Sequence, residues 1–340
     1  MPLTALEQIA QQLVAKGKGI LAADESSPTI KKRLDTIGVD SNENNRLKYR
    51  HLLFSTGDLE EYISGVILFE ETLFQSTHSG VPLVNILQEK GIIPGIKVDK
   101  GTVPLANFPQ ETVTQGLDGL RERLKMYAEA GAKFTKWRAV INVGQDLPSA
   151  FAIKCNAHNL ARFAALSQQA GMVPIVEPEI LMDGAHTIEQ CEEAAYRTLN
   201  CVFHELFQHK VHLEGMLLKA SMVTAGKSCT LQNSVEQTSE ATLRVLSRCL
   251  PSAVPGVVFL SGGQSPTQAT ENLNALNQQK NLPWELSFSF GRALQEPVLN
   301  SWKGEDCNQT EAQQVLYFRA KLNGAARFGN YSTDNENSVV

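Results

Sequence analysis

The sequence predicts a (β/α)₈ barrel, an α/β fold, built as a single domain over residues 1–340. Three observations favour it. Eight short apolar runs of strand length are spread along the chain, helical patterns lie between most of them, and charged residues gather at the ends of the runs. Strands that alternate with helices are typical of α/β folds, and eight such units are typical of the barrel. An open doubly wound sheet is the alternative, which strand count alone excludes only weakly.

The composition is that of an ordinary globular chain, since 42% of its 340 residues are hydrophobic and 20% are charged. The formal net charge of −5 does not favour nucleic-acid or membrane binding, and no apolar run approaches the length of a membrane span. The six cysteines form no Cys-x-x-Cys pair, and the N-terminus carries no targeting pattern. We therefore expect reduced thiols and a cytoplasmic location.

An extra helix is expected to precede the first strand. Thr4 and Glu7 have the spacing of a capping box, and apolar residues repeat on one helical face from Leu6 to Val14. Gly17 is suited to end this helix. Because the helix comes before the first strand, we expect it to cover one end of the fold.

The eight predicted strands are Gly19–Asp24, Ser64–Phe69, Ile92–Asp99, Ala132–Ile141, Met172–Ile180, His212–Met222, Gly256–Gly262 and Trp284–Arg292. The predicted helices are Asn44–Leu53, Thr114–Ala130, Pro148–Ala170, Thr187–Gln208, Ser234–Cys249, Ser265–Gln279 and Thr310–Leu322. Their caps support several of these assignments, for example a capping box at Thr187 and Gln190, and Pro266 in a first turn. Residues 324–340 read as a polar, flexible C-terminal tail.

Charged residues stand at or near the carboxyl ends of separate apolar strands, namely Asp24, Lys97, Lys136, Arg138, Glu177, Glu179, Lys219 and Arg292. In a barrel these ends converge on one mouth, which is where active sites lie. Because side chains alternate along a strand, Lys136 shares a face with Arg138, and Glu177 shares one with Glu179. Any single member could be a structural charge, and Lys97 could simply pair with Asp99. The set as a whole indicates a functional site.

Lys219 is the most informative of these residues because it lies in an otherwise apolar strand. A buried ammonium is costly unless it is paired or loses its proton, and a neutral amine attacks carbonyl carbon. A second cation nearby, Lys136, would disfavour a positive charge on Lys219. The alternative is an ordinary lysine at a strand end that points into solvent.

The cations indicate an anionic ligand. Ser261, Gly262 and Gly263 follow the seventh strand and lead into a helix, and backbone amides of such a loop can approach a phosphate closely. Gly291 and Arg292, at the eighth strand, would complete this phosphate site. A second and weaker phosphate site combines the cations Arg33, Lys97 and Arg138.

Metal-assisted catalysis is disfavoured, and no cofactor is expected. None of the seven histidines belongs to a His-x-x-x-His motif, and most fall in predicted helices or loops and not at strand ends. We therefore expect a lysine that bonds to a carbonyl carbon to withdraw electrons from the substrate, in place of a metal ion.

Seven motifs, in this order along the chain, together resemble the class I fructose-bisphosphate aldolase family. They are GILAADES (19–26), GIKVDKG (95–101), FTKWR (134–138), PIVEPEI (174–180), LEGMLLK (213–219), FLSGGQS (259–265) and FSFGRALQ (288–295). The resemblance runs from the first helix to about Leu322. It implies a (β/α)₈ barrel that cleaves fructose 1,6-bisphosphate reversibly into glycerone phosphate and glyceraldehyde 3-phosphate.

The resemblance also implies roles. Lys219 would form the Schiff base, Glu177 would serve carbinolamine formation and dehydration, and Asp24 would take the C4 hydroxyl proton. Lys136 would hold developing charge, with Glu179 orienting its neighbours. The C1 phosphate would be bound by Ser261, Gly262, Gly291 and Arg292, with Gly263 and Ser289 as further substrate-binding residues. The C6-phosphate side would be lined by Ser26, Arg33, Lys97 and Arg138.

The chain departs from the family pattern in two places. The family's tail often ends in a tyrosine implicated in proton exchange at C3, whereas the sequence given ends at Val340, and Tyr331 is not expected to take that role. Ser27-Pro28-Thr29 is a local variation that could alter affinity on the C6-phosphate side.

Three questions stay open on the sequence. Rival functions are another Schiff-base lyase or transaldolase acting on a sugar phosphate, and a catalytically silent barrel that serves as a binding scaffold. The family implies a homotetramer, which the sequence does not show. Nor does it separate a glycolytic or gluconeogenic role from a carbon-fixing one in the Calvin cycle, where sedoheptulose bisphosphate could also be a substrate.

Overall fold

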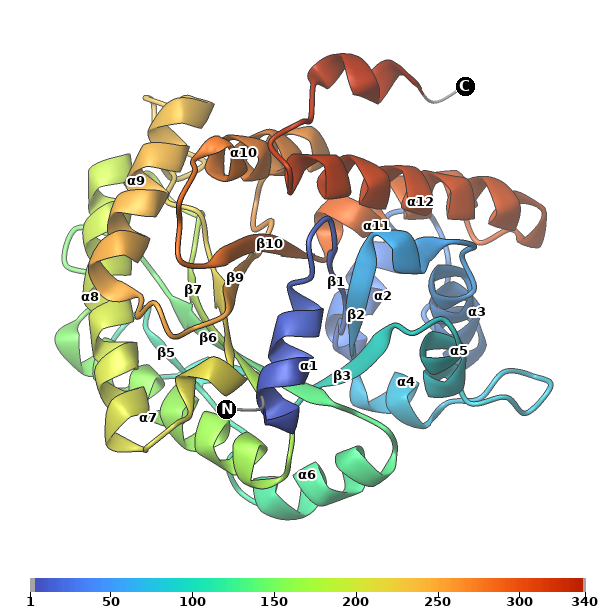
Figure 1. Cartoon of the computed structure of the whole chain (residues 1–340), viewed down its shortest axis with the longest axis horizontal. Helices are drawn as coiled ribbons and strands as arrows, with labels where there is room; N and C mark the ends of the chain where they lie inside the picture. Colours follow the sequence, from blue (N-terminus) through green and yellow to red (C-terminus); the bar gives the residue numbers. More distant parts are fainter. Residues whose placement is uncertain (1–3, 339–340) are drawn as a thin grey trace.

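The computed structural model describes residues 4–338 and shows a closed barrel of eight parallel strands (Figure 1). The strands follow one another around the barrel in the order β1-β10-β9-β8-β7-β6-β3-β2. Their bounds are β1 Gly19–Ala23, β2 Ile63–Leu68, β3 Ile93–Lys97, β6 Phe134–Ile141, β7 Val173–Ile180, β8 Leu217–Ala220, β9 Gly256–Phe259 and β10 Glu285–Phe290. Because β1 pairs with both β2 and β10, the sheet is closed, and the open doubly wound alternative is excluded.

Helices surround the barrel, and most of them follow a strand. Their bounds are α1 Ala5–Leu13, α2 Ser27–Asp35, α3 Glu43–Phe54, α4 Glu70–Phe74, α5 Leu83–Glu89, α6 Leu120–Glu129, α7 Ala150–Gln169, α8 Ile188–Gln208, α9 Val235–Cys249, α10 Pro266–Gln278, α11 Arg292–Trp302 and α12 Gln309–Ala326. The predicted capping box at Thr187 and Gln190 is present, and Ser265 caps α10 with Pro266 in the first turn. None of the helices in residues 4–338 is long and apolar enough to cross a membrane.

Several predicted boundaries were wrong. Thr114 lies in a short hairpin of β4 Thr102–Pro104 and β5 Thr112–Thr114, and α6 begins only at Leu120. The cause is Gly119, whose left-handed backbone (φ 64°) precedes the helix. Pro148 lies outside α7, which Ser149 caps. The sixth predicted strand is shorter than expected, because the 3₁₀ turn Leu213–Gly215 occupies its first part.

Four helices escaped prediction, namely α2, α4, α5 and α11. Three of them have nine residues or fewer, which is too short for a clear helical period. The fourth, α11, begins at Arg292, the residue that the prediction placed at the end of a strand. Short helices depend on packing for their stability, and their own sequence signals them weakly.

The helix α1 closes one end of the barrel, as predicted. Its buried Leu13 and the adjoining Val14 pack in one apolar cluster with Phe134, Val173 and Leu217. Those three are the first residues of β6, β7 and β8, so α1 covers the end where the strands begin. In Figure 1 it lies across the middle of the strands. The opposite end is left open.

The chain's C-terminal part packs on the barrel further than predicted. Helix α12 continues to Ala326, so the expected tail begins within a helix. Arg327 and Tyr331 are buried, and Glu336, within a 3₁₀ segment (333–338), forms an ion pair with Arg319 of α12 (2.5 Å). Val340 lies outside the described residues, and mobility of the tail stays a prediction.

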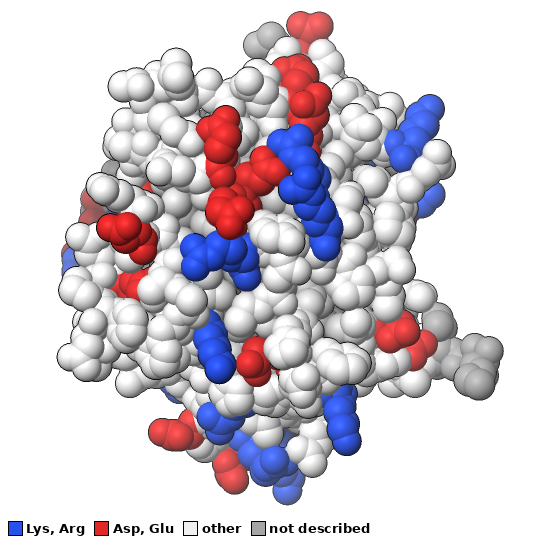
Figure 2. Space-filling model, turned by 90° about the vertical axis from the view of Figure 1, so that its left-hand side faces the viewer, with Lys and Arg blue, Asp and Glu red and all other residues white. Residues whose placement is uncertain are grey.

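The side of the molecule formed by α8 and α9 carries mixed charges. In Figure 2, acidic and basic side chains are interspersed there with neutral ones, and the basic groups form no continuous patch on this face. Arg244 of α9 and Glu192 of α8 form an ion pair that joins the two helices, at 2.6 Å. This face therefore offers nothing that favours nucleic-acid binding.

Candidate active site

A cleft of about 1060 Å³ opens at the carboxyl ends of the barrel strands. It brings together all of the residues that the sequence nominated. They are Asp24, Ser26, Arg33, Lys97, Lys136, Arg138, Glu177, Glu179, Lys219, Ser261, Gly262, Gly263, Ser289, Gly291 and Arg292. The closed parallel barrel is the reason, since it gathers the ends of strands that are far apart in the chain.

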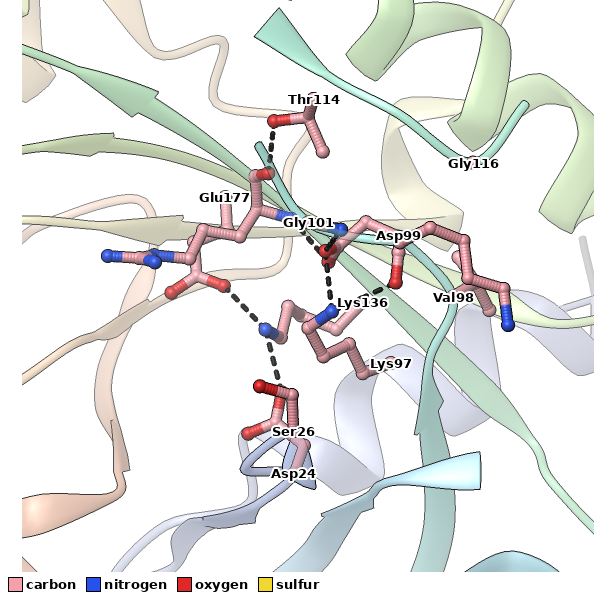
Figure 3. Close-up of polar contacts among 12 residues, drawn as sticks. Asp24, Ser26, Lys97, Val98, Asp99, Gly101, Thr114, Gly116, Lys136 and Glu177 are labelled. Atoms are coloured by element: carbon pink, nitrogen blue, oxygen red, sulfur yellow. Dashed lines mark hydrogen bonds and ion pairs between the residues drawn. The ribbon is translucent and has the colours of Figure 1, made fainter. Parts of the chain in front are cut away.

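Two lysines and two carboxylates form a continuous chain of contacts in the floor of this cleft. Lys219 Nζ lies 3.2 Å from Glu177 Oε1, and Lys136 Nζ lies 3.2 Å from Glu177 Oε2. Lys136 Nζ also lies 2.7 Å from Asp24 Oδ2, so it bridges the two carboxylates, as Figure 3 shows. Lys136, Glu177 and Lys219 are buried, and Asp24 is nearly so. Lys219 therefore does not point into solvent.

Each charge in this chain stabilises the next. Burial by itself would raise the pKa of Asp24, but the positive charges of Lys136 and Lys219 outweigh burial and hold that pKa well below its usual value. Burial would likewise raise the pKa of Glu177, but the same two lysines lower it. Burial would lower the pKa of Lys136, whereas Asp24 and Glu177 raise it well above the usual value. Both carboxylates are thus ionised at neutral pH, and Lys136 is a cation.

The sequence analysis named Lys136 as the group that disfavours charge on Lys219, and the structure adds a carboxylate to this pair of lysines. Glu177 lies between the two amines and touches both. A carboxylate in that place can accept a proton from either amine. The strand pattern did not reveal this contact, because it joins residues of three separate strands.

The cations that the sequence nominates for the C6 phosphate form ion pairs with carboxylates. Lys97 Nζ lies 2.5 Å from Asp99 Oδ1, the structural pairing that the sequence left open (Figure 3). Arg138 forms an ion pair with Glu179, so the described partner of Glu179 is Arg138 and not Lys136.

Arg33 forms an ion pair with Glu25, which Arg50 also contacts at 2.7 Å. These carboxylates hold the guanidinium and ammonium groups in place. A phosphate that binds there would have to share the cations with the carboxylates or displace the carboxylates from them.

The glycine loop is the part of the cleft that the sequence nominates for the C1 phosphate. Gly262 adopts a left-handed backbone (φ 54°), and the loop leads into α10, whose first turn Ser265 caps. Arg292 donates a hydrogen bond to the carbonyl oxygen of Gly262. Within residues 4–338 no carboxylate lies in ion-pair distance of Arg292, so its charge remains available to an anion.

Glu25 and Lys227 are among the charged residues of the cleft that the sequence analysis did not nominate. Glu25, directly after Asp24, is buried and holds Arg33 and Arg50, and Gln295 donates to it at 2.8 Å. Lys227 lines the cleft from the loop after β8 and lies so close to Gly263 that a Cβ there would overlap its Cε atom. The sequence offered one signal for Lys227, which is its position after a glycine in the loop that follows a strand end.

The donor groups of the cleft are not those of a transition-metal centre. Among the described residues that line it there is no histidine and no cysteine. The acids Asp24, Glu177, Glu179 and Asp99 each contact a lysine or arginine. A divalent cation would have to displace those cations, so the arrangement suits amine and carboxylate chemistry.

Comparison with known proteins agrees with this chemistry. Residues 5–340 match the family model described as fructose-bisphosphate aldolase class-I. A relative from Xanthomonas campestris, named probable fructose-bisphosphate aldolase class 1, is 53% identical over 97% of this chain and 99% of its own length. A relative from Toxoplasma gondii, named fructose-bisphosphate aldolase 1, is 54% identical over 96% of this chain and 90% of its own.

A solved structure is similarly close. It is fructose-bisphosphate aldolase from Plasmodium falciparum, in complex with TRAP and a small-molecule inhibitor, with a TM-score of 0.95 and 52% identity. The match covers 96% of this chain and 95% of that one. These likenesses favour an aldol-cleaving lyase over the transaldolase and silent-scaffold alternatives.

Proposed function

Since the chain belongs to the class I fructose-bisphosphate aldolase family, we propose that Lys219 is its Schiff-base lysine. This glycolytic family consists of lyases that cleave fructose 1,6-bisphosphate reversibly. The cleavage proceeds through a lysine Schiff base without a metal ion. The observation that carries the proposal is the contact of its Nζ with Glu177, 3.2 Å away, in the buried floor of the cleft. An ammonium must lose a proton to become a nucleophile, and the adjoining carboxylate can accept that proton.

Glu177 acts first as a base and then as an acid. At rest it is a carboxylate, because Lys136 and Lys219 lower its pKa. It takes one proton from the ammonium form of Lys219, and the neutral amine then bonds to the C2 carbonyl carbon. The excess proton on the nitrogen passes to the former carbonyl oxygen, which gives a neutral carbinolamine with a hydroxyl group. It returns that proton to the departing hydroxyl, so that water leaves and a positively charged iminium remains.

Asp24 takes the C4 hydroxyl proton when the C3–C4 bond breaks. The electron pair of that bond moves into the iminium, which becomes a neutral enamine. Burial raises the pKa of Asp24, and the positive charges of Lys136 and then Lys219 lower it by more. As cleavage neutralises the charge at Lys219, Asp24 becomes more basic in the step in which it accepts the proton. Lys136 keeps its charge and separates the two carboxylates throughout.

The two phosphates of the substrate bind at opposite sides of the cleft. Ser261, Gly262, Gly291 and Arg292 hold the C1 phosphate, with Gly263 and Ser289 close by, and Ser26, Arg33, Lys97 and Arg138 line the C6 side. Support comes from the lining of a single cleft by all of these residues. Charge-assisted bonds from lysine and arginine to phosphate give the affinity and fix the sugar over Lys219.

Borohydride trapping tests the proposal. Reduction of the enzyme in the presence of fructose 1,6-bisphosphate should leave a secondary amine on Lys219, located by mass spectrometry of the peptides. Lys219→Ala should give no adduct and lose cleavage. Lys100→Ala, at a lysine on the rim of the same cleft that pairs with Glu70, should trap normally. Cleavage that survives Lys219→Ala would falsify the assignment.

Finer features of the function are also proposals. We infer a homotetramer and a cytoplasmic location from the family and from the reduced cysteines. Light scattering of the purified chain tests the tetramer, and a monomer would contradict it. Gluconeogenic and carbon-fixing roles remain alternatives to the glycolytic one, and turnover of sedoheptulose bisphosphate distinguishes the last of them.

A further inference from the structure

A cluster of metal-ligand residues lies on the outer wall of the barrel, outside the cleft. His158 comes from α7, and Glu205 and His209 come from the last turn of α8 and its C-terminal cap. Their donor atoms all lie within 4.8 Å of one another. The cleft is lined from the strand ends at which the connecting loops begin, whereas α8 ends where the chain returns to the start of β8. The cluster therefore has no part in the lysine chemistry.

Both imidazole rings face the same carboxylate. His158 Nδ1 lies 3.0 Å from Glu205 Oε2, and His209 Nδ1 lies 3.7 Å from the same oxygen. The ring centroids are 4.9 Å apart at an angle of 68°. Glu205 is thus approached from two sides by imidazole rings that belong to two different helices.

One ring is oriented by a backbone contact. His209 Nδ1 lies 2.9 Å from the carbonyl oxygen of Glu205. A carbonyl oxygen only accepts, so this bond requires a proton on Nδ1 and leaves the lone pair on Nε2. Metal-bound histidines commonly donate their second N–H to a carbonyl or carboxylate in this way.

We propose that His158, Glu205 and His209 form a zinc site that links α7 to α8. Two imidazoles and one carboxylate are a common zinc ligand set, and water can fill the fourth position because half of the His158 side chain is exposed. Tetrahedral zinc with bonds of about 2.0–2.1 Å holds its ligands about 3.3 Å apart, so small rotations of these partly exposed side chains suffice. The i, i+4 spacing of Glu205 and His209 already places both on one helical face.

Zinc titration of the metal-free full chain tests the site. Isothermal calorimetry should show one equivalent of Zn²⁺ bound per chain with micromolar affinity, together with a higher melting temperature that EDTA reverses. His158→Gln and Glu205→Gln should each weaken binding by at least about tenfold and abolish the thermal shift. The matched control is His204→Gln, an exposed histidine on the same helix, which should bind zinc as the unmodified chain does.

Two outcomes would overturn the proposal. One is no saturable uptake of zinc below about 100 μM by a folded chain. The other is unchanged affinity in both His158→Gln and Glu205→Gln, which would assign the bound zinc to other groups such as the exposed Cys307. Aldol cleavage should be equal with and without EDTA in every variant, so this test is independent of the Schiff-base assignment.

Discussion

At the scale of single residues, the ion pairs in the floor of the cleft determine the protonation states of its side chains. Lys136 bridges Asp24 and Glu177, and Glu177 in turn contacts Lys219. Each buried ion has an opposite charge within hydrogen-bonding distance, which is the condition under which burial of charge is tolerated. Removal of one member should therefore change the protonation of the others.

Lys136→Met tests this coupling. The substitution removes the charge that lowers the pKa of Asp24 and of Glu177, so both pKa values should rise. We expect the acidic limb of the pH profile of kcat/KM to move upward by about one unit or more, and kcat to fall by about 10²- to 10⁴-fold. In the control Lys100→Met the limb should stay in place. If the acidic limb of the Lys136→Met profile stays in place, this lysine does not set the pKa values of Asp24 and Glu177.

Lys227→Met tests the cation that the sequence analysis missed. Lys227 lines the cleft beside Gly263, and its one ion pair within residues 4–338 is a long one with Asp183, at 3.8 Å. We expect KM for fructose 1,6-bisphosphate to rise about tenfold with kcat little changed, because the lost contact serves ground state and transition state alike.

The position of Lys227 can be tested with a second substrate. Fructose 1-phosphate keeps the C1 phosphate and lacks the other one, so Lys227→Met should impair its use equally. A penalty seen only with the bisphosphate would assign Lys227 to the C6 phosphate.

At the scale of elements, α1 has a structural task away from the chemistry. Leu13 is fully buried at the end of the barrel opposite the cleft, and a Cβ added at Gly65 would lie 2.6 Å from Leu13 Cδ2. The helix thus fills the end of the barrel at the close packing of a protein interior.

Leu13→Ala should destabilise the fold by about 2–5 kcal/mol, because it leaves a cavity in this cluster. Urea unfolding followed by fluorescence measures the change. Ile9→Ala, at a partly buried position of the same helix, is the control and should cost less. The value of kcat/KM well below the unfolding transition should be nearly unchanged in both variants. A loss of activity without a loss of stability would contradict a purely structural role for α1.

At the scale of the whole molecule, the buried carboxylates make stability depend on pH. Asp24 and Glu177 have ordinary pKa values of 3.8 and 4.5 and lower ones in the folded chain. Their stabilising effect is therefore complete above the ordinary values and is lost as pH falls through the folded values. Lys136 has a raised pKa, so its effect is complete below 10.5 and disappears only on further alkalinisation.

Glu177→Gln should flatten the acidic side of the stability profile. One carboxyl that stays ionised in the folded chain contributes a slope of about 1.4 kcal/mol per pH unit below its ordinary pKa. Between about pH 4.5 and pH 3, the free energy of unfolding of the variant should fall less steeply with pH, by up to that slope. Urea unfolding at several pH values measures this difference. Glu240→Gln, at an exposed position of α9, should keep it. Parallel profiles for Glu177→Gln and the unmodified chain would contradict the lowered pKa.

The sequence by itself determined what depends on neighbours along the chain. Strand-length apolar runs, capped helices and charges at strand ends are local patterns, so they predicted the barrel, its closing helix and the charged residues nominated for the cleft. Ser26 and Ser289 were nominated through the family resemblance. The hairpin of β4 and β5 and the short helices escaped because their stability comes from packing against distant segments. The roles of the nominated residues remain predictions.

Only the tertiary structure decided the partners of the charges. Strand register sets Arg138 beside Glu177 and Lys97 beside Lys136, and nothing in either local sequence encodes that alignment. It is also the fold that placed Glu177 between the two amines and gave each C6-side cation its carboxylate. The physical reason is that electrostatic energy depends on distance in space, which the closed barrel sets for strand ends far apart along the chain.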